Sequence, residues 1–263
     1  MKKIWLTSII SSQKVVNQVR SRLSPYALDI NGHFWEDDVK CGAWAKATGE
    51  LVQSNTALWI ILTTDENLKK TSVLYGLSLL AMTVQAEKGL NFPIIFLQTK
   101  GKTIKQETLP TLFNRAFVMK AFDSGTEAKI TAKMHMPLKQ KFAQYHMNIY
   151  TMHQIGQWFE IGPTQESWQG AIFGVSGDEV EIDFHAVGKR GKLPETSRLR
   201  YAMEGLKLSS GKKKITAWAV QNDIDSDTSY FIRIVGYPES IIFGAYPKED
   251  QADLFAVNLI TSF

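Results

Sequence analysis

Short, predominantly apolar runs are the feature of the first half that most restricts its fold. Three of them, at residues 4–10, 57–62 and 92–97, lack the alternation of a strand with one wet face. The segments between them complete the series: helical patterns at 15–23, 43–52, 68–87 and 126–133, and weaker strand patterns at 27–30 and 116–120. Strands that are apolar throughout are typical of a parallel sheet with helices on both faces. The first half therefore predicts an α/β domain.

The pattern changes in the second half. Seven short β-type runs follow one another there, at residues 156–161, 169–175, 179–187, 199–208, 214–221, 229–235 and 240–245. Clusters of Gly, Pro, Asp and Ser separate them at the spacing of an antiparallel sandwich or barrel. We predict an α/β domain over 1–135, a linker over 136–152 and an antiparallel β domain over 153–263. Residues 138–151 fit a connecting helix and an edge segment equally.

Composition and cysteine content define the class of protein. The chain is 44% hydrophobic and 21% charged, which is typical of a globular protein. Its one cysteine, Cys41, has no partner for an internal disulfide, which favours a reducing compartment. The apolar run 4–10 contains Thr7 and Ser8 and leads into no signal-peptidase site, so we interpret it as a buried strand. The longest later apolar run, 73–81, is shorter than the roughly 20 residues of a membrane span. We expect a cytoplasmic protein without a membrane partner.

The features of the first half also have a recognisable order. A strand ends at Ser8, a helix follows, and the segment Phe34-Trp35-Glu36-Asp37-Asp38 precedes Gly42. The strand 58–63, the segment 72–81 and the strand 93–97 come next. This order resembles a Toll/interleukin-receptor (TIR) domain or its nucleoside deoxyribosyltransferase-like relatives, over roughly residues 1–125. The resemblance implies a flavodoxin-like sheet that binds NAD or another nucleotide at the carboxyl ends of its strands. It also implies self-association through this domain.

The chemistry of these families depends on one carboxylate. Cleavage of a glycosidic bond needs a carboxylate near the ribose, as nucleophile or to stabilise the developing oxocarbenium ion. By resemblance that glutamate would stand near Leu74-Tyr75-Gly76, where this chain has no acid. Five acids follow the second and third expected strands and are the candidate replacements: Glu36, Asp37, Asp38, Asp65 and Glu66. The alternative is that Asp65 caps the helix beginning near Leu68 and that the other acids lie in loops.

The candidate site follows from these positions. We predict Ser8, Trp35, Glu36 and Asp65 as ligand-binding residues, and Glu36, Asp37 and Asp65 as the catalytic candidates if the chain is an enzyme. Trp35 would stack on a base or a nicotinamide ring, although a tryptophan beside Phe34 also suits a core anchor. An acid desolvated in a cleft beside Ser8 or Trp35 would favour an enzyme, and acids on the open surface would favour a binding module.

The sequence predicts no metal site. Asp223, Asp225 and Asp227 alternate as in a calcium loop, but the positions for its glycine and glutamate hold Thr228 and Ile234. We therefore expect a hairpin loop. The histidines show no zinc-ligand spacing. The aromatic residues of the second half are expected to form the core of the β domain: Trp158, Phe159, Trp168, Phe173, Phe184, Trp218, Tyr230, Phe231 and Phe243.

Three functions remain open. We expect a cytoplasmic binding or signalling module that takes a nucleotide-like ligand or a second copy in its first domain and a protein partner in its β domain. The second hypothesis is an N-glycosidase acting on NAD or a nucleoside with a relocated carboxylate. The third is a nucleic-acid binder, because residues 1–135 hold 17 Lys and Arg against 11 Asp and Glu, whereas residues 136–263 hold 13 against 15. We rank it last because these basic residues are scattered.

Overall fold

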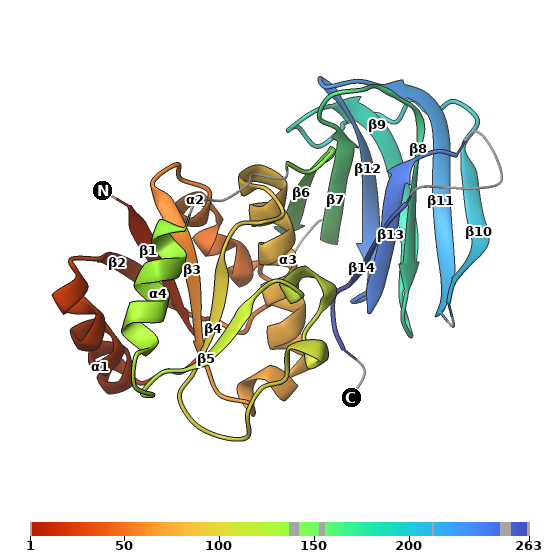
Figure 1. Ribbon diagram of the computed structural model, residues 1–263. Helices are drawn as coiled ribbons and strands as arrows, with labels where there is room; N and C mark the ends of the chain where they lie inside the picture. The colour runs from red at the N-terminus through yellow and green to blue at the C-terminus, as the bar shows by residue number, and fades with distance from the viewer. Residues whose placement is uncertain (1, 137–141, 153–155, 212, 248–253, 262–263) are drawn as a thin grey trace. The chain divides into compact units, whose positions relative to one another are not determined.

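The chain forms two compact units, each with its own core. The computed structural model describes residues 2–136, 142–152, 156–211, 213–247 and 254–261. An α/β unit holds residues up to 39 and from 43 to 142, and a β unit holds 40–42 and 143–261 (Figure 1). The predicted fold class, an α/β domain followed by an antiparallel β domain, is confirmed.

The sheet of the α/β unit has five parallel strands in the order β2-β1-β3-β4-β5. Their bounds are β1 (Lys3–Ser8), β2 (Asp29–Phe34), β3 (Thr56–Thr63), β4 (Ile94–Gln98) and β5 (Phe117–Lys120). The chain leaves β1 towards one edge of the sheet and leaves β3 towards the other. The carboxyl ends of β1 and β3 therefore flank a topological switch point, where open α/β sheets bind ligands.

Successive side chains of the strands point to opposite faces of this sheet, and both faces are covered by other elements. Ile60 and its even-numbered neighbours pack with α1 (Gln13–Leu23) and α4 (Thr126–His135). Trp59 and Phe96 contact Phe113 on the other face. The remaining helices are α2 (Thr48–Leu51), α3 (Thr71–Lys88), η1 (Ser24–Tyr26), η2 (Ala43–Ala47), η3 (Asn67–Lys69), η4 (Gln106–Thr108) and η5 (Thr111–Phe113).

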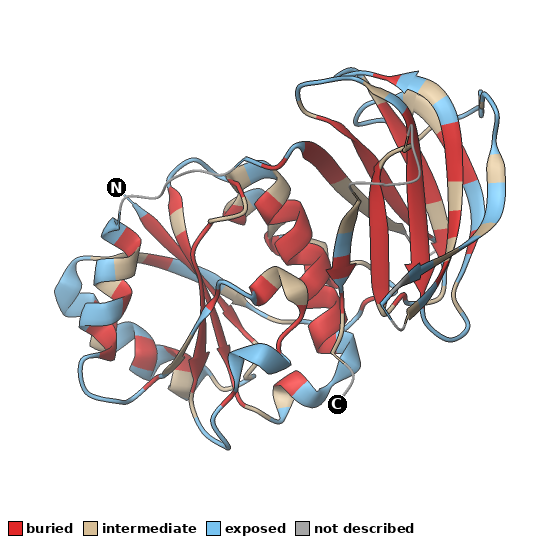
Figure 2. Ribbon diagram, turned by 45° about the vertical axis from the view of Figure 1, so that its right-hand side comes forward, coloured by how far each residue is buried: buried red, intermediate tan, exposed pale blue. Residues whose placement is uncertain are grey.

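The central helix α3 is buried from Val73 to Gln85, as the red helix of Figure 2 shows. An apolar surface on every side is what such burial requires. The helix ends at Gly89, whose positive φ of 92° suits glycine. The helix expected over 43–52 is instead a 3₁₀ helix followed by one short α-helical turn.

The β unit consists of two antiparallel sheets. One has the order β6-β7-β12-β9 and the other β10-β11-β8-β13-β14. The bounds are β6 (Tyr145–Met152), β7 (Gly156–Pro163), β8 (Trp168–Ser176), β9 (Glu181–Lys189), β10 (Met203–Ser210), β11 (Lys213–Ile224), β12 (Thr228–Val235), β13 (Ser240–Ala245) and β14 (Phe255–Asn258). Because the sheets are separate, the architecture is a sandwich and not a barrel.

Aromatic side chains join the two sheets. Phe159 lies 5.3 Å from Phe173, and Tyr145 lies 4.8 Å from Phe243, between ring centroids. Phe184, expected in this core, is instead 36% exposed. Part of the expected linker, residues 145–152, forms strand β6, so the edge-segment interpretation holds there; residues 137–141 lie outside the described residues.

Among the residues that the structure describes, no helix is long and apolar enough to cross a membrane.

Candidate functional site

The acids after strand β2 are bonded to separate partners on the surface. Glu36 Oε2 lies 2.5 Å from Lys46 Nζ, and both side chains are about 60% exposed. Asp37 Oδ2 accepts a hydrogen bond of 2.9 Å from the Ser72 hydroxyl at the start of α3. Asp38, the third acid of this segment, is also exposed. The structure therefore does not gather these three acids into a desolvated cleft.

Asp65 is more enclosed, with 15% of its side chain exposed. Its carboxylate lies where a Cβ on Gly101 would stand, so the loop after β4 packs directly over it. Gln98 shapes that loop, because its amide donates to the carbonyls of Lys100 at 3.0 Å and Lys102 at 2.7 Å. Lys69 Nζ is 3.9 Å from the Asp65 carboxylate. Of the catalytic candidates Glu36, Asp37 and Asp65, only Asp65 is thus shielded from solvent.

Thr64, and not its neighbour Asp65, caps the short helix η3 that follows β3. The Thr64 hydroxyl accepts a hydrogen bond of 3.2 Å from the Asn67 amide and donates one of 2.7 Å to Asn67 Oδ1. These bonds satisfy the amide that opens η3. The capping role expected for Asp65 is therefore wrong, and its carboxylate is left to face Gly101.

Trp35 packs on the central helix. Its backbone amide donates to the Ser8 carbonyl at 2.8 Å, which carries the β1–β2 pairing past the end of both strands. A Cβ on Gly76 of α3 would lie 2.8 Å from Cζ2 of Trp35 and 3.4 Å from Cβ of Trp44. The indole ring thus covers the stretch of α3 where the TIR resemblance places a glutamate. Trp35, although half-buried, anchors the segment after β2 on α3, and glycine at 76 is what admits it.

Ser8 lines a pocket of about 120 Å³ in the α/β unit. Its wall combines apolar and polar residues from α1, from the carboxyl-terminal half of β1 and from most of β2: Leu6, Ser8, Gln13, Val16, Arg20, Ile30, Asn31, Gly32, His33 and Phe34. The other predicted ligand-binding residues, Trp35, Glu36 and Asp65, are not part of this wall. The pocket is of the size that holds one small ring or one phosphate group, because an engineered cavity of about 150 Å³ takes up benzene.

The polar groups of the pocket are held in defined positions. The Ser8 hydroxyl donates to the Ile10 carbonyl at 2.7 Å, and Arg20 donates to the Ile30 carbonyl at 3.1 Å. His33 accepts a hydrogen bond of 3.1 Å from Trp5 Nε1 on its Nδ1 atom. Burial lowers the pKa of His33, and Lys46 adds to that effect against Glu36, which opposes it. His33 is therefore neutral near pH 7, and Arg20 supplies the positive charge of the pocket.

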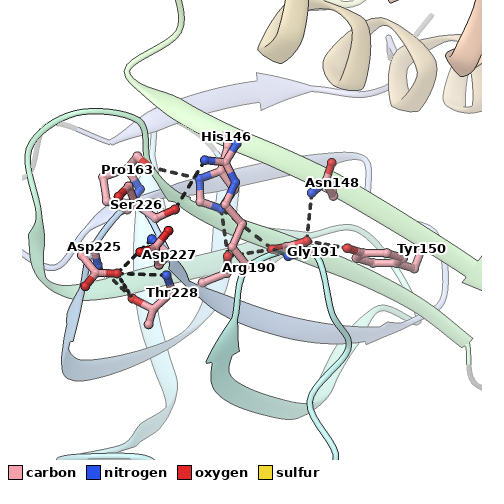
Figure 3. A network of polar contacts seen from close by, with 12 residues as sticks. His146, Asn148, Tyr150, Pro163, Arg190, Gly191, Asp225, Ser226, Asp227 and Thr228 are labelled. Carbon is pink, nitrogen blue, oxygen red and sulfur yellow. Dashed lines mark hydrogen bonds and ion pairs between the residues drawn. The ribbon is translucent and has the colours of Figure 1, made fainter.

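The β unit contains a buried carboxylate that sequence reasoning missed. Glu160 on β7 is fully buried and accepts four hydrogen bonds, which Figure 3 shows in part. The donors are Tyr150 at 2.5 Å, Gly191 N at 2.6 Å, Ser229 at 2.7 Å and Asn148 at 2.9 Å. Burial alone would raise the pKa of Glu160, but these four donors outweigh it and hold the pKa below its usual value. Glu160 is ionised at neutral pH.

The sequence does carry one signal for Glu160. It is the only charged residue in the β-type run 156–161, and a charge within a buried run needs a partner. Its donors come from residues 148, 150, 191 and 229, a combination that only the sheet order creates. The loop of Asp223, Asp225 and Asp227 is a tight turn, where Asp225 Oδ1 accepts from the amides of Asp227 and Thr228, each at 3.0 Å. The expected hairpin is wrong, because β11 and β12, which this turn joins, belong to different sheets.

No protein-family model and no curated protein sequence matches the chain. Within the described part of the chain, no group of three or more His, Cys, Asp or Glu side chains could hold a metal ion.

Proposed function

We propose that the chain is a cytoplasmic binding module whose α/β unit takes up a nucleotide-like ligand without cleaving it. The observation that carries the proposal is the pocket of about 120 Å³ that Ser8 lines beside α1. It reaches the carboxyl ends of two parallel strands and the first residue of α1, Gln13, and the amino terminus of a helix favours phosphate groups. Arg20 adds a positive charge, and Phe34 adds an aromatic wall.

The size of the pocket determines how such a ligand would bind. A phosphate or a single ring fits inside, and the rest of a nucleotide would extend along the edge of the sheet. The TIR resemblance of residues 1–125 supports the ligand class. The packing of Trp35 on Gly76 supports binding over hydrolysis, because it covers the stretch of α3 that would hold the family's glutamate.

The enzyme hypothesis has one specific observation in its favour. Asp65 is shielded beneath the loop after β4, and a shielded carboxylate at the edge of an α/β sheet is a catalytic candidate. An N-glycosidase that uses Asp65 is therefore the second candidate function.

Titration of the full chain with ADP-ribose, AMP and inorganic phosphate tests the proposal, with amide shifts followed by NMR. We expect the shifts to centre on Ser8, Gln13 and Gly32. Arg20→Ala should weaken binding of the phosphate-bearing ligands by about 1.5–3 kcal/mol, the range for a charged hydrogen bond. The control Glu36→Gln, whose side chain pairs with Lys46 outside the pocket wall, should bind like the wild type. Equal affinity in Arg20→Ala and the wild type would overturn the assignment of the pocket.

A further inference from the structure

The outer face of the β6-β7-β12-β9 sheet carries a chain of polar contacts that has one more contact than a neutral histidine can supply with protons. His146 Nδ1 lies 3.2 Å from the Pro163 carbonyl, and His146 Nε2 lies 2.9 Å from the Ser229 hydroxyl. That hydroxyl donates to Glu160 at 2.7 Å. Figure 3 shows His146 beside Pro163 and Arg190 beside Gly191. The carbonyl and the carboxylate only accept, so the three contacts require three protons.

A neutral imidazole leaves one of these contacts without a proton. It supplies one N–H, and the Ser229 hydroxyl supplies the second proton. The third arrives only when His146 is protonated, and it then lies between His146 Nε2 and the Ser229 oxygen. The His146 ring is buried and occupies the space where a Cβ on Gly162 would stand. In this orientation His146 Nε2 lies 4.0 Å from Glu160 Oε1, close enough for an ion pair when His146 is protonated.

The same carboxylate anchors a segment that follows β9. The Gly191 amide donates to Glu160 Oε1 at 2.6 Å, and the Arg190 amide donates to the Asp227 carbonyl at 2.8 Å. Leu193 packs against the cluster of Trp158, Ala186 and Phe231. We call residues 190–194 the strap. It has no regular secondary structure. Its polar attachments include the Gly191 bond to Glu160 in the sheet and the Arg190 bonds to the Asp227 and Ser226 carbonyls of the turn before β12.

We propose that protonation of His146 releases the strap and uncovers Trp158 and Phe231. An imidazolium would offset the charge of Glu160 and so weaken its bond to the Gly191 amide. It would also place a second positive charge near the Arg190 guanidinium, at the start of the strap. The new hydrogen bond from His146 to Ser229 joins β6 to β12, so it does not hold the strap.

The charges around His146 are consistent with release of the strap on protonation. Burial lowers the pKa of His146, and Arg190 lowers it further, whereas the Pro163 carbonyl and Glu160 raise it. The other titratable groups of the network are Tyr150, which donates to Glu160, and Asp225 and Asp227 of the turn bonded to Arg190. When the strap is closed, the charge of Arg190 near His146 lowers the pKa of His146. Thermodynamic linkage is reciprocal, so protonation of His146 must in turn destabilise the closed strap.

Amide hydrogen exchange of Gly191 in the full chain tests the proposal, at about pH 7.5 and 5.5, one unit on either side of the ordinary imidazole pKa. After correction for the intrinsic pH dependence of exchange, we expect the protection to fall by roughly three- to tenfold on acidification, since one pKa unit corresponds to tenfold. Arg190→Gln should raise the pKa of His146 and reduce that fall to less than about twofold.

Two further variants keep the test decisive. Lys192→Gln removes a charge from the same strap, from a surface ion pair with Glu195 at 3.1 Å, and should respond like the wild type. His146→Gln keeps hydrogen-bonding groups but does not titrate, so its protection should not change with pH. Protection that is equal at both pH values in the wild type would overturn the proposal. So would a full response in Arg190→Gln, or a response that survives in His146→Gln and therefore belongs to another group such as His185.

Discussion

At the scale of single residues, the contact of Trp35 with Gly76 decides how the first half is packed. Gly76→Ala would place a methyl group 2.8 Å from the indole ring, so Trp35 or α3 must move. We expect a loss of about 1–3 kcal/mol in the free energy of unfolding, the usual cost of overpacking. Gly49→Ala is the matched control, because nothing lies within 4 Å of its added methyl group. It should be neutral or stabilise α2 by up to about 1 kcal/mol in urea unfolding. Equal effects of the two substitutions would contradict the packing.

Glu160 makes a second residue-level prediction. Glu160→Gln keeps the shape but replaces one carboxylate oxygen with an NH₂ group that faces two of the four donors, and it should cost about 1–3 kcal/mol, as for other buried groups left unpaired. The surface control Glu181→Gln should change stability by less than about 0.5 kcal/mol.

The pH dependence of stability follows from the same network. The folded-state pKa values of Glu160 and His146 both lie below the ordinary 4.5 and 6.5. The unfolded chain therefore takes up protons first, so both groups stabilise the fold at neutral pH and lose that contribution as pH falls. Wild-type stability should decline below pH 6.5 through His146, together with His33 and His185, whose pKa values burial also lowers, and again below 4.5 through Glu160. Glu160→Gln should show a smaller second decline in urea unfolding measured across this range, because Glu127 and Asp225, whose pKa values are also lowered, keep their part. An undiminished decline below 4.5 would assign it wholly to other carboxyls.

Sequence reasoning reached some of these residues and missed others for physical reasons. It placed Ser8 at the end of the first strand, where the pocket lies, and it allowed Trp35 as a core anchor. It considered Asp65 as the cap and overlooked Thr64, although both precede the same turn and both side chains can accept an amide hydrogen bond. Glu160 was missed because its donors come from strands and a loop distant in sequence.

At the scale of elements, the edge strand β2 forms one wall of the pocket. Gly32 lies opposite Leu6, and a Cβ there would overlap the Leu6 carbonyl. Gly32→Ala should therefore push β2 away from β1, cost about 1–3 kcal/mol and weaken ligand binding. Asn31→Ala, on the same strand with an exposed side chain, should leave stability within about 0.5 kcal/mol. Denaturation and ligand titration of both variants check this; a stable Gly32→Ala variant would show that the strand has room to shift.

Element prediction succeeded where the hydrophobic pattern is strong. The apolar runs 57–62 and 92–97 became β3 and β4, and the helical pattern 68–87 became η3 and α3. Strand β14 was missed, and β6 was not distinguished from a connecting helix, because both are sheet-edge strands with polar residues such as Asn148 and Asn258 in their sequences. The pattern over 43–52 is compatible with α and 3₁₀ geometry, and local periodicity does not distinguish the two over so few residues.

At the scale of the whole molecule, each unit has its own core, so we expect a substitution in one unit to leave the stability of the other unchanged. Gly76 lies in the α/β unit and Glu160 in the β unit, and no contact partner is common to them. The effects of Gly76→Ala and Glu160→Gln on stability should therefore add within about 0.5 kcal/mol in the double variant. Residue-resolved unfolding by NMR should show each substitution acting on amides of its own unit. A coupling larger than about 1 kcal/mol would contradict this separation.

The central claim is that the α/β unit binds a nucleotide-like ligand and leaves it intact. Mass spectrometry of concentrated protein incubated with NAD and a mixture of nucleosides tests it most directly, when NMR follows the amides of Ser8 and Gly32 in the same samples. The account predicts shifts at these amides with NAD and the nucleosides recovered whole. Release of nicotinamide or free base that is lost in Asp65→Asn would contradict it, and would establish an enzyme that uses the carboxylate beneath the loop of Gly101.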